Sequence, residues 1–163
     1  MQNRHIERKA EVMMKLAEAL LLRSECQKKI ESLQSRILAN LKVQEEDRPH
    51  ENPQELLKEA FELNDQLCAL VKQINARNNI AALPNGTVLS EALADRDMLM
   101  KKRSLLAAIA AKANERDYRL THTEVKMRVT LPIGELQKQI DSLSRSFREL
   151  DTQIQAVNWT VDL

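Results

Sequence analysis

The chain has 163 residues, of which 43% are hydrophobic and 30% charged, a composition that indicates a folded, soluble, helix-rich domain and excludes a largely disordered chain. Its 25 basic and 24 acidic residues nearly cancel, so no net field favours nucleic acid or an anionic membrane surface. Only four residues are aromatic, so we expect a core of aliphatic side chains, Met and Ala, which suits helix packing better than a sheet.

The start of the chain, residues 1–13, is polar and lacks the apolar stretch of a secretory signal. We therefore expect a polar N-terminal extension, a cytoplasmic location and a single helical bundle domain over residues 14–163. Cys26 and Cys68 fall on or beside apolar helical stripes, and in a cytosol we expect both thiols to be reduced.

Two long helices are predicted in the first half of the chain. Apolar residues recur at helical spacing from Met14 and predict a helix over residues 14–43, which ends in an acidic run before Pro49. Asn52 and Pro53 predict the start of the next helix, over residues 53–78, because Asn caps free amides and Pro suits the first turn. The apolar seam of this second helix alternates spacings of three and four: Leu56, Ala60, Leu63, Leu67, Leu70 and Ile74.

The segment 80–88 contains Asn85-Gly86 between short apolar pieces, which predicts a small β-hairpin. A third helix follows over residues 90–115, with Ser90, or else Thr87, as its N-cap. Its predicted apolar side is Leu93, Leu99, Leu106 and Ala110, widened by Met98, Leu105 and Ile109. The Ala-rich run 106–113 permits close approach of another helix or of a partner.

Between residues 118 and 131 the period changes to alternation, which predicts a short strand region that pairs locally or with another subunit. The fourth helix is predicted over residues 132–158. Its seam is eight apolar residues, again three and four apart: Ile133, Leu136, Ile140, Leu143, Phe147, Leu150, Ile154 and Val157.

Four helices of similar length with matching seams predict a mainly α fold, an antiparallel four-helix bundle with long coiled-coil-like helices. In an up-down-up-down bundle, the first and third helices would start where the second and fourth end. Polar residues would then converge at that end: Glu18, Arg23, Asn75, Asn78, Arg96, Asp97, Asn158 and Trp159.

Several short motifs resemble a family of small helical bacterial proteins, mostly uncharacterised, some of which are labelled septicolysin after a cytolysin. The similarity covers Met14 to Leu163, and the residues that carry it are the following: Met14 to Arg23, Lys42-Val43-Gln44-Glu45, Ile74-Asn75, Glu91-Ala92-Leu93, Arg96-Asp97 and Asn158-Trp159-Thr160. The resemblance implies a helical fold and, through the septicolysin label, a membrane-active cytolysin. It identifies no reaction.

Two interpretations of the polar end remain open. In the first, an Arg23–Glu18 or Arg96–Asp97 ion pair satisfies the charges while the Asn amides cap chain reversals. In the second, the end is a ligand site for a small anion, with the arginines as donors and Trp159 as a wall. The residues of this second interpretation are Arg23, Asn75, Asn78, Arg96, Asp97, Asn158 and Trp159.

No catalytic, metal-binding or cofactor-binding motif is found in the sequence. The histidines His5, His50 and His122 have no ligand spacing around them, and no helix carries an inward Glu-x-x-His pair. The glycines, Gly86 and Gly134, form no phosphate-binding loop. We therefore predict no metal and no cofactor, and no motif in the sequence supports an enzyme, although catalysis at the polar end stays open.

Three functions are compatible with the sequence. The first is a structural or interaction protein that self-associates into a homo-oligomer through the strand region and the Ala-rich helix face. The second is a septicolysin-like cytolysin, although the mixed charges of the first and fourth helices do not favour membrane insertion. The third is a binder of a small anionic ligand at the polar end. No nucleic-acid partner is expected.

Overall fold

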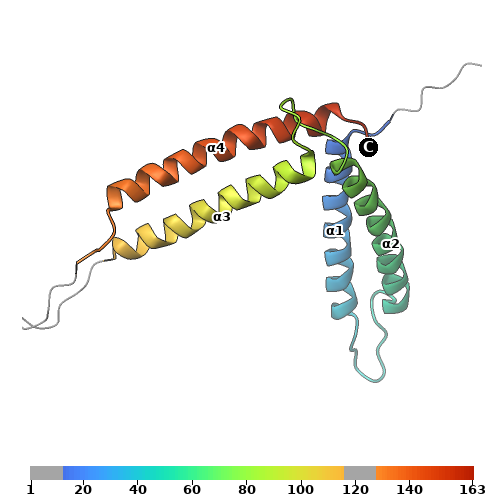
Figure 1. Ribbon diagram of the computed structural model, residues 1–163. Helices are drawn as coiled ribbons and strands as arrows, with labels where there is room; N and C mark the ends of the chain where they lie inside the picture. Colours follow the sequence, from blue (N-terminus) through green and yellow to red (C-terminus); the bar gives the residue numbers. More distant parts are fainter. Residues whose placement is uncertain (1–12, 116–127) are drawn as a thin grey trace, which may run out of the picture. The chain divides into compact units, whose positions relative to one another are not determined.

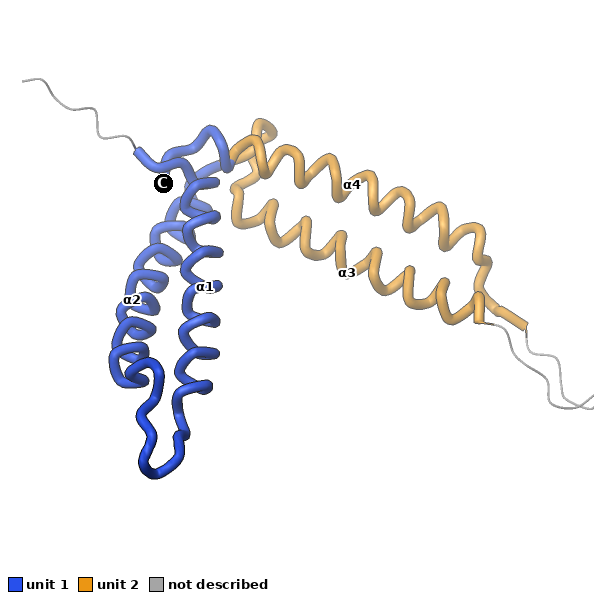
Figure 2. Tube along the Cα trace, turned by 180° about the vertical axis from the view of Figure 1, so that it is seen from behind, with its two compact units in different colours: residues 1–81, 158–163 blue, residues 82–157 orange. Residues whose placement is uncertain are grey.

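The fold consists of four helices that pack in pairs. The computed structural model describes residues 13–115 and 128–163, and its helices are α1 (Leu16–Ala39), α2 (Pro53–Asn78), α3 (Leu89–Ala113) and α4 (Ile133–Thr160). Contacts divide the chain into two compact units, one of residues 1–81 with 158–163 and one of residues 82–157 (Figure 2). The four predicted helices are therefore present. A single bundle domain that unites them stays a prediction.

Unit 1 contains α1 and α2, which lie side by side and antiparallel (Figure 1). The predicted seam of α2 is buried or half-buried along its whole length. Its contacts with α1 centre on Leu33, Leu56 and Ala60, against which Ile37 and Leu63 pack. Long aliphatic side chains from both helices thus form the core, as the scarcity of aromatic residues predicted.

The helix ends of unit 1 follow local side-chain chemistry. The Asn52 side chain accepts a hydrogen bond from the Gln54 amide at 3.0 Å, and Pro53 is the first residue of α2, as predicted. Helix α1 ends at Ala39 and not near residue 43. The Nδ2 of Asn40 donates a hydrogen bond to the carbonyl oxygen of Arg36 at 3.0 Å, and such local side-chain bonds compete with continuation of a helix.

Unit 2 contains α3 and most of α4, which also run antiparallel and side by side in both views (Figures 1 and 2). All eight predicted seam residues of α4 are buried or half-buried, with Leu136, Ile154 and Val157 the most deeply buried. On α3, Leu89, Ala92 and Ala110 are buried. The perfect spacing of the α4 seam thus corresponds to side chains that the chain itself covers.

The predicted β-hairpin at 80–88 is reduced to one antiparallel bridge, between Ala82 and Val88. The Leu83 amide donates to the Thr87 carbonyl at 2.8 Å, and the Gly86 amide donates to Leu83 at 2.9 Å. Gly86 has φ of +87°, which explains why the turn needs glycine there. The strands do not extend further because Val88 is already the N-cap of α3, which also shows that the predicted caps Ser90 and Thr87 were wrong.

Two predicted segments lie wholly or partly outside the described residues. Residues 1–12 of the predicted extension and residues 118–127 of the predicted strand region lie outside the described part of the chain. Residues 128–131 are described and contain no strand. Among the described helices, none combines the length and apolar character that crossing a membrane requires.

Candidate functional site

The residues predicted to bind a ligand are divided between the two units. Arg23, Asn75, Asn78, Asn158 and Trp159 belong to unit 1, and Arg96 and Asp97 belong to unit 2. The convergence of both groups at one polar end stays a prediction.

In unit 1, the last residues of the chain meet the start of α1 in a short antiparallel ladder. The Leu16 amide donates to the Val161 carbonyl at 2.9 Å, and the Leu163 amide donates to the Met14 carbonyl at 2.8 Å. Leu16 is the first residue of α1, whose first amides have no partner within the helix. The C-terminal segment therefore satisfies one of them with a backbone carbonyl.

Charged side chains also form hydrogen bonds and an ion pair at the start of α1. The Nζ of Lys15 donates to Oδ1 of Asp162 at 2.6 Å and to the Thr160 carbonyl at 3.2 Å, while the backbone amide of Lys15 donates to Oε2 of Glu18 at 2.7 Å. Glu18 was predicted as a partner for Arg23, but its carboxylate serves the helix start instead. Arg23 lies on α1 more than a turn beyond Glu18 and is half-buried.

The end of α2 forms a small hollow of about 260 Å³ next to the last residue of the chain. None of the predicted ligand-binding residues lines it. The lining residues are Gln73, Ala76, Arg77, Ile80 and Leu163. Asn158 is only 5% exposed and is the one polar side chain buried in the described parts of the chain, whereas Trp159 is 56% exposed. A ligand site formed by these residues stays a prediction.

In unit 2, Arg96 is already bound by two carboxylates. Its Nη1 donates to Oδ1 of Asp151 on α4 at 3.1 Å, and its Nη2 donates to Oδ1 of Asp97 at 3.4 Å. The Arg96–Asp97 pair was one of the two interpretations of the sequence, and it is present. Asp151 was missed, although its position beside Leu150 and four residues after Phe147 places a carboxylate at the border of the α4 seam.

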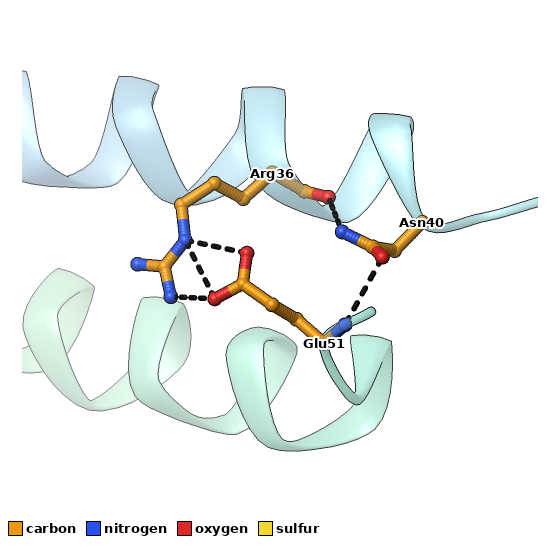
Figure 3. A network of polar contacts seen from close by, with 3 residues as sticks. All are labelled: Arg36, Asn40 and Glu51. Carbon is orange, nitrogen blue, oxygen red and sulfur yellow. Dashed lines mark hydrogen bonds and ion pairs between the residues drawn. The ribbon is translucent and has the colours of Figure 1, made fainter. Parts of the chain in front are cut away.

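The opposite end of unit 1 carries a clamp of Arg36, Asn40 and Glu51 that the sequence analysis did not identify (Figure 3). The Nε–H of Arg36 donates to both carboxylate oxygens of Glu51, at 3.1 and 3.0 Å, and Nη2 donates to Oε1. The Glu51 amide donates to Oδ1 of Asn40 at 3.1 Å. The clamp thus ties the end of α1 to the loop residue that precedes the N-cap of α2.

Hydrogen bonding within the clamp perturbs both charged groups. The bond from Arg36 lowers the pKa of Glu51 below its ordinary value, and the same bond raises the pKa of Arg36. A hollow of about 640 Å³ lies in the adjoining loop. It is lined by Ala39, Asn40, Lys42, Val43, Gln44, Asp47, Arg48 and His50.

Helix α3 has an exposed surface where the sequence predicted core residues. Met98 and Leu105 were predicted to widen the apolar side of α3 that packs in the core, but they are 46% and 62% exposed. At 3.6 residues per turn they lie roughly 100° to 140° around the helix from Leu99 and Ala110. They share their side with Ala94 and Ala108 and also with Lys101 and Lys112, all of which are exposed. We call Ala94, Met98, Leu105 and Ala108 the outer face of α3.

The described residues contain no group of three His, Cys, Asp or Glu side chains placed to hold a metal ion. The outer face of α3 had a signal in the sequence, because positions 94, 98, 105 and 108 fall within about 80° of the helix circumference, together with Lys101 and Lys112. That arc could have been separated from the Leu93, Leu99, Leu106 and Ala110 side by the same arithmetic.

Comparison with known proteins places this chain among proteins whose function is unknown. A family of unknown function, DUF6847, matches residues 23–163. A crystal structure of a functionally unknown conserved protein from Corynebacterium diphtheriae is 38% identical in sequence, with a TM-score of 0.84. The match covers 93% of this chain and 99% of that one. A comparison with curated proteins found no match.

Proposed function

Since this chain belongs to DUF6847, a family of unknown function, we propose its function from its own surface: it is a structural or interaction protein that self-associates. The observation that carries the proposal is the outer face of α3. This helix has apolar residues on the side packed within unit 2 and also two large exposed ones, Met98 and Leu105, which lie on the same side as Lys101. Large exposed apolar side chains on a helix are a candidate contact surface for another protein.

The chemistry of the outer face suits another helix. Met98 and Leu105 supply the large apolar area, and full burial of each would contribute about 2 kcal/mol. Ala94 and Ala108 flank them with small side chains, which permit a second helix to approach to about 8 Å between axes. A second copy of the chain offers an identical face, so a two-fold dimer buries it on both partners at once.

Light scattering of the purified chain over the micromolar range tests the proposal. We expect a dimer for the wild type and a monomer for Leu105→Glu, because the substitution places two carboxylates in an apolar contact. Leu38→Glu is a matched control, since Leu38 is 61% exposed on α1 and the change adds the same charge. It should remain dimeric. A wild type that stays monomeric at about 100 μM, well above the micromolar dissociation constants of typical weak dimers, would refute self-association.

The second candidate function, binding of a small anion, has less support than self-association because one of its two arginines already has carboxylate partners. Two carboxylates already hold the guanidinium of Arg96. The Arg23→Ala, Arg96→Ala double variant distinguishes the two functions, because a ligand site predicts lost metabolite binding whereas an ion-pair role predicts only a lower Tm. Release of dye from liposomes by the wild-type chain would instead favour the cytolysin that the septicolysin resemblance implies.

A further inference from the structure

The helix pair α1–α2 and the helix pair α3–α4 correspond to each other in sequence. We infer that residues 14–83 and residues 87–163 are two repeats of one helical hairpin, equivalent residue by residue along their helices, and that the end of each repeat pairs with the start of the other. The helices align without a gap when Leu16 is matched to Leu89 and Leu56 to Leu136. The equivalence does not depend on the proposed self-association.

Polar residues are identical at equivalent positions of the two repeats. In the first helices the identical polar pairs are Glu18/Glu91, Arg23/Arg96, Lys28/Lys101 and Lys29/Lys102. In the second helices they are Glu55/Glu135, Lys58/Lys138, Gln73/Gln153 and Asn78/Asn158. A shared apolar period accounts for matched leucines in two amphipathic helices, but it does not require the same charged and amide residues between them. These identities therefore indicate a repeat of the sequence itself.

The most deeply buried residues are equivalent as well. Among the described residues, the largest fully buried side chains are Leu16, Leu89, Ile74 and Ile154. They form two equivalent pairs, Leu16 with Leu89 and Ile74 with Ile154, and each unit contains one member of each pair. Close-packed positions constrain side-chain volume tightly. The two helical hairpins are thus packed alike, each within its own unit.

The same alignment relates the two short antiparallel ladders. The Leu163 amide donates to the Met14 carbonyl at 2.8 Å, and the Leu83 amide donates to the Thr87 carbonyl at 2.8 Å. Leu163 corresponds to Leu83, and Met14 corresponds to Thr87. The bridged pairs correspond in the same way, Lys15 with Asp162 and Val88 with Ala82. The last residues of each repeat therefore bond to the residues that precede the first helix of the other.

The repeats differ in how their shared arginine is bound. The guanidinium of Arg96 donates to Asp151 at 3.1 Å. In unit 1 the equivalent arginine is Arg23, which is also half-buried, and the residue equivalent to Asp151 is Val71. A carboxylate at position 71 should therefore meet the guanidinium of Arg23 as Asp151 meets Arg96.

Exchanging the order of the repeats tests the inference with every residue of the chain retained. The exchanged chain consists of residues 1–13, 87–163, 84–86 and 14–83 in that order, so the Pro84-Asn85-Gly86 turn joins the C-terminal ladder and the other ladder is left open. We expect its helix content by circular dichroism to equal that of the wild type and its Tm to lie within a few degrees, because both ladders can form as before.

A control chain contains the same residues in the order 1–13, 84–163 and 14–83, which joins Leu163 directly to Met14. An antiparallel pair needs turn residues between its strands, so this chain should lose that ladder and melt at a lower temperature than the exchanged chain. An exchanged chain that is unfolded, or no more stable than the control chain, would overturn the inference.

A substitution in unit 1 tests the equivalence of individual residues. We expect Val71→Asp to lower Tm by about 2 °C less in the wild-type background than in an Arg23→Ala background, because the new carboxylate pairs with Arg23. Val71→Asn is the matched uncharged control and should lower Tm equally in both backgrounds. If Val71→Asp also has equal effects in both, Arg23 does not occupy the place of Arg96 and the residue-by-residue equivalence is wrong.

Discussion

Each unit contains an ion pair that joins two elements, and the two pairs differ in how exposed their side chains are. Arg96 and Asp151 join α3 to α4 with side chains that are 26% and 33% exposed. Arg36 and Glu51 join the end of α1 to the loop before α2, where both side chains are more exposed. Partial burial reduces solvent screening, so the first pair should matter more for stability than the second.

The Arg96–Asp151 pair can be measured with a double-mutant cycle. We expect Asp151→Ala to lower the free energy of unfolding by about 1 kcal/mol, because it leaves a half-buried guanidinium without its interhelical partner. Chemical denaturation of Arg96→Ala, Asp151→Ala and the double variant should show a coupling of about 0.5 kcal/mol. The exposed Glu149→Ala is the control, and additive single effects would contradict the pairing.

The Arg36–Glu51 pair should give a pH-dependent effect. The pKa of Glu51 is lowered in the folded state, so the pair stabilises the fold above the ordinary value of 4.5 and loses its effect as pH falls through the lower folded pKa. We expect Glu51→Gln to lower Tm at pH 7 and to have progressively less effect below pH 4.5. Thermal melts of both proteins between pH 7 and pH 3 measure this, and a constant difference would exclude the linkage.

At the scale of elements, the C-terminal ladder couples residues that are far apart in sequence. Residues 161–163 bond to residues 14–16 through backbone and side-chain atoms. The ladder caps α1 with a segment that follows α4 directly. Unit 1 therefore depends on the last residues of the chain as well as on its own two helices.

Ending the chain at Thr160 should destabilise unit 1. The truncation removes two backbone hydrogen bonds and the Lys15–Asp162 pair, and at about 1 kcal/mol for each backbone bond we expect a loss of about 2 kcal/mol. Circular dichroism during thermal unfolding is the measurement. Asp162→Asn should have a smaller effect because it leaves the backbone ladder in place. Equal Tm values for the truncated and full chains would show that the ladder does not contribute.

At the scale of the whole molecule, self-association links stability to concentration. If only the folded chain dimerises through the outer face of α3, mass action stabilises the folded state more as the protein concentration rises. The apolar residues of that face are then part of the stability of the assembly. In a single copy, Met98 and Leu105 remain exposed and bury little apolar area.

We therefore expect the Tm of the wild type to rise by a few degrees between about 1 and 100 μM, as a stabilisation of 1 to 2 kcal/mol would produce. Leu105→Glu should have a Tm that does not change with concentration, whereas Leu38→Glu should behave as the wild type does. Scanning calorimetry at several concentrations provides the measurement. A wild-type Tm independent of concentration would argue against a coupled dimer.

The sequence by itself determined the features that depend on neighbouring residues. The spacing of three and four defined the seams of α2 and α4, because residues on one side of a helix recur with its 3.6-residue period. Asn52 and Pro53 defined the start of α2 through bonds that span only two residues. These features need no knowledge of the partner helix.

Only the tertiary structure decided the features that join distant residues. Asp151 meets Arg96 across 55 positions of sequence, and Lys15 meets Asp162 across 147. Met98 and Leu105 are apolar like the core residues, and only the packing of α3 showed that they face away from it. Helical periodicity identifies which residues share a side, but the side that is buried depends on where the other helices pack.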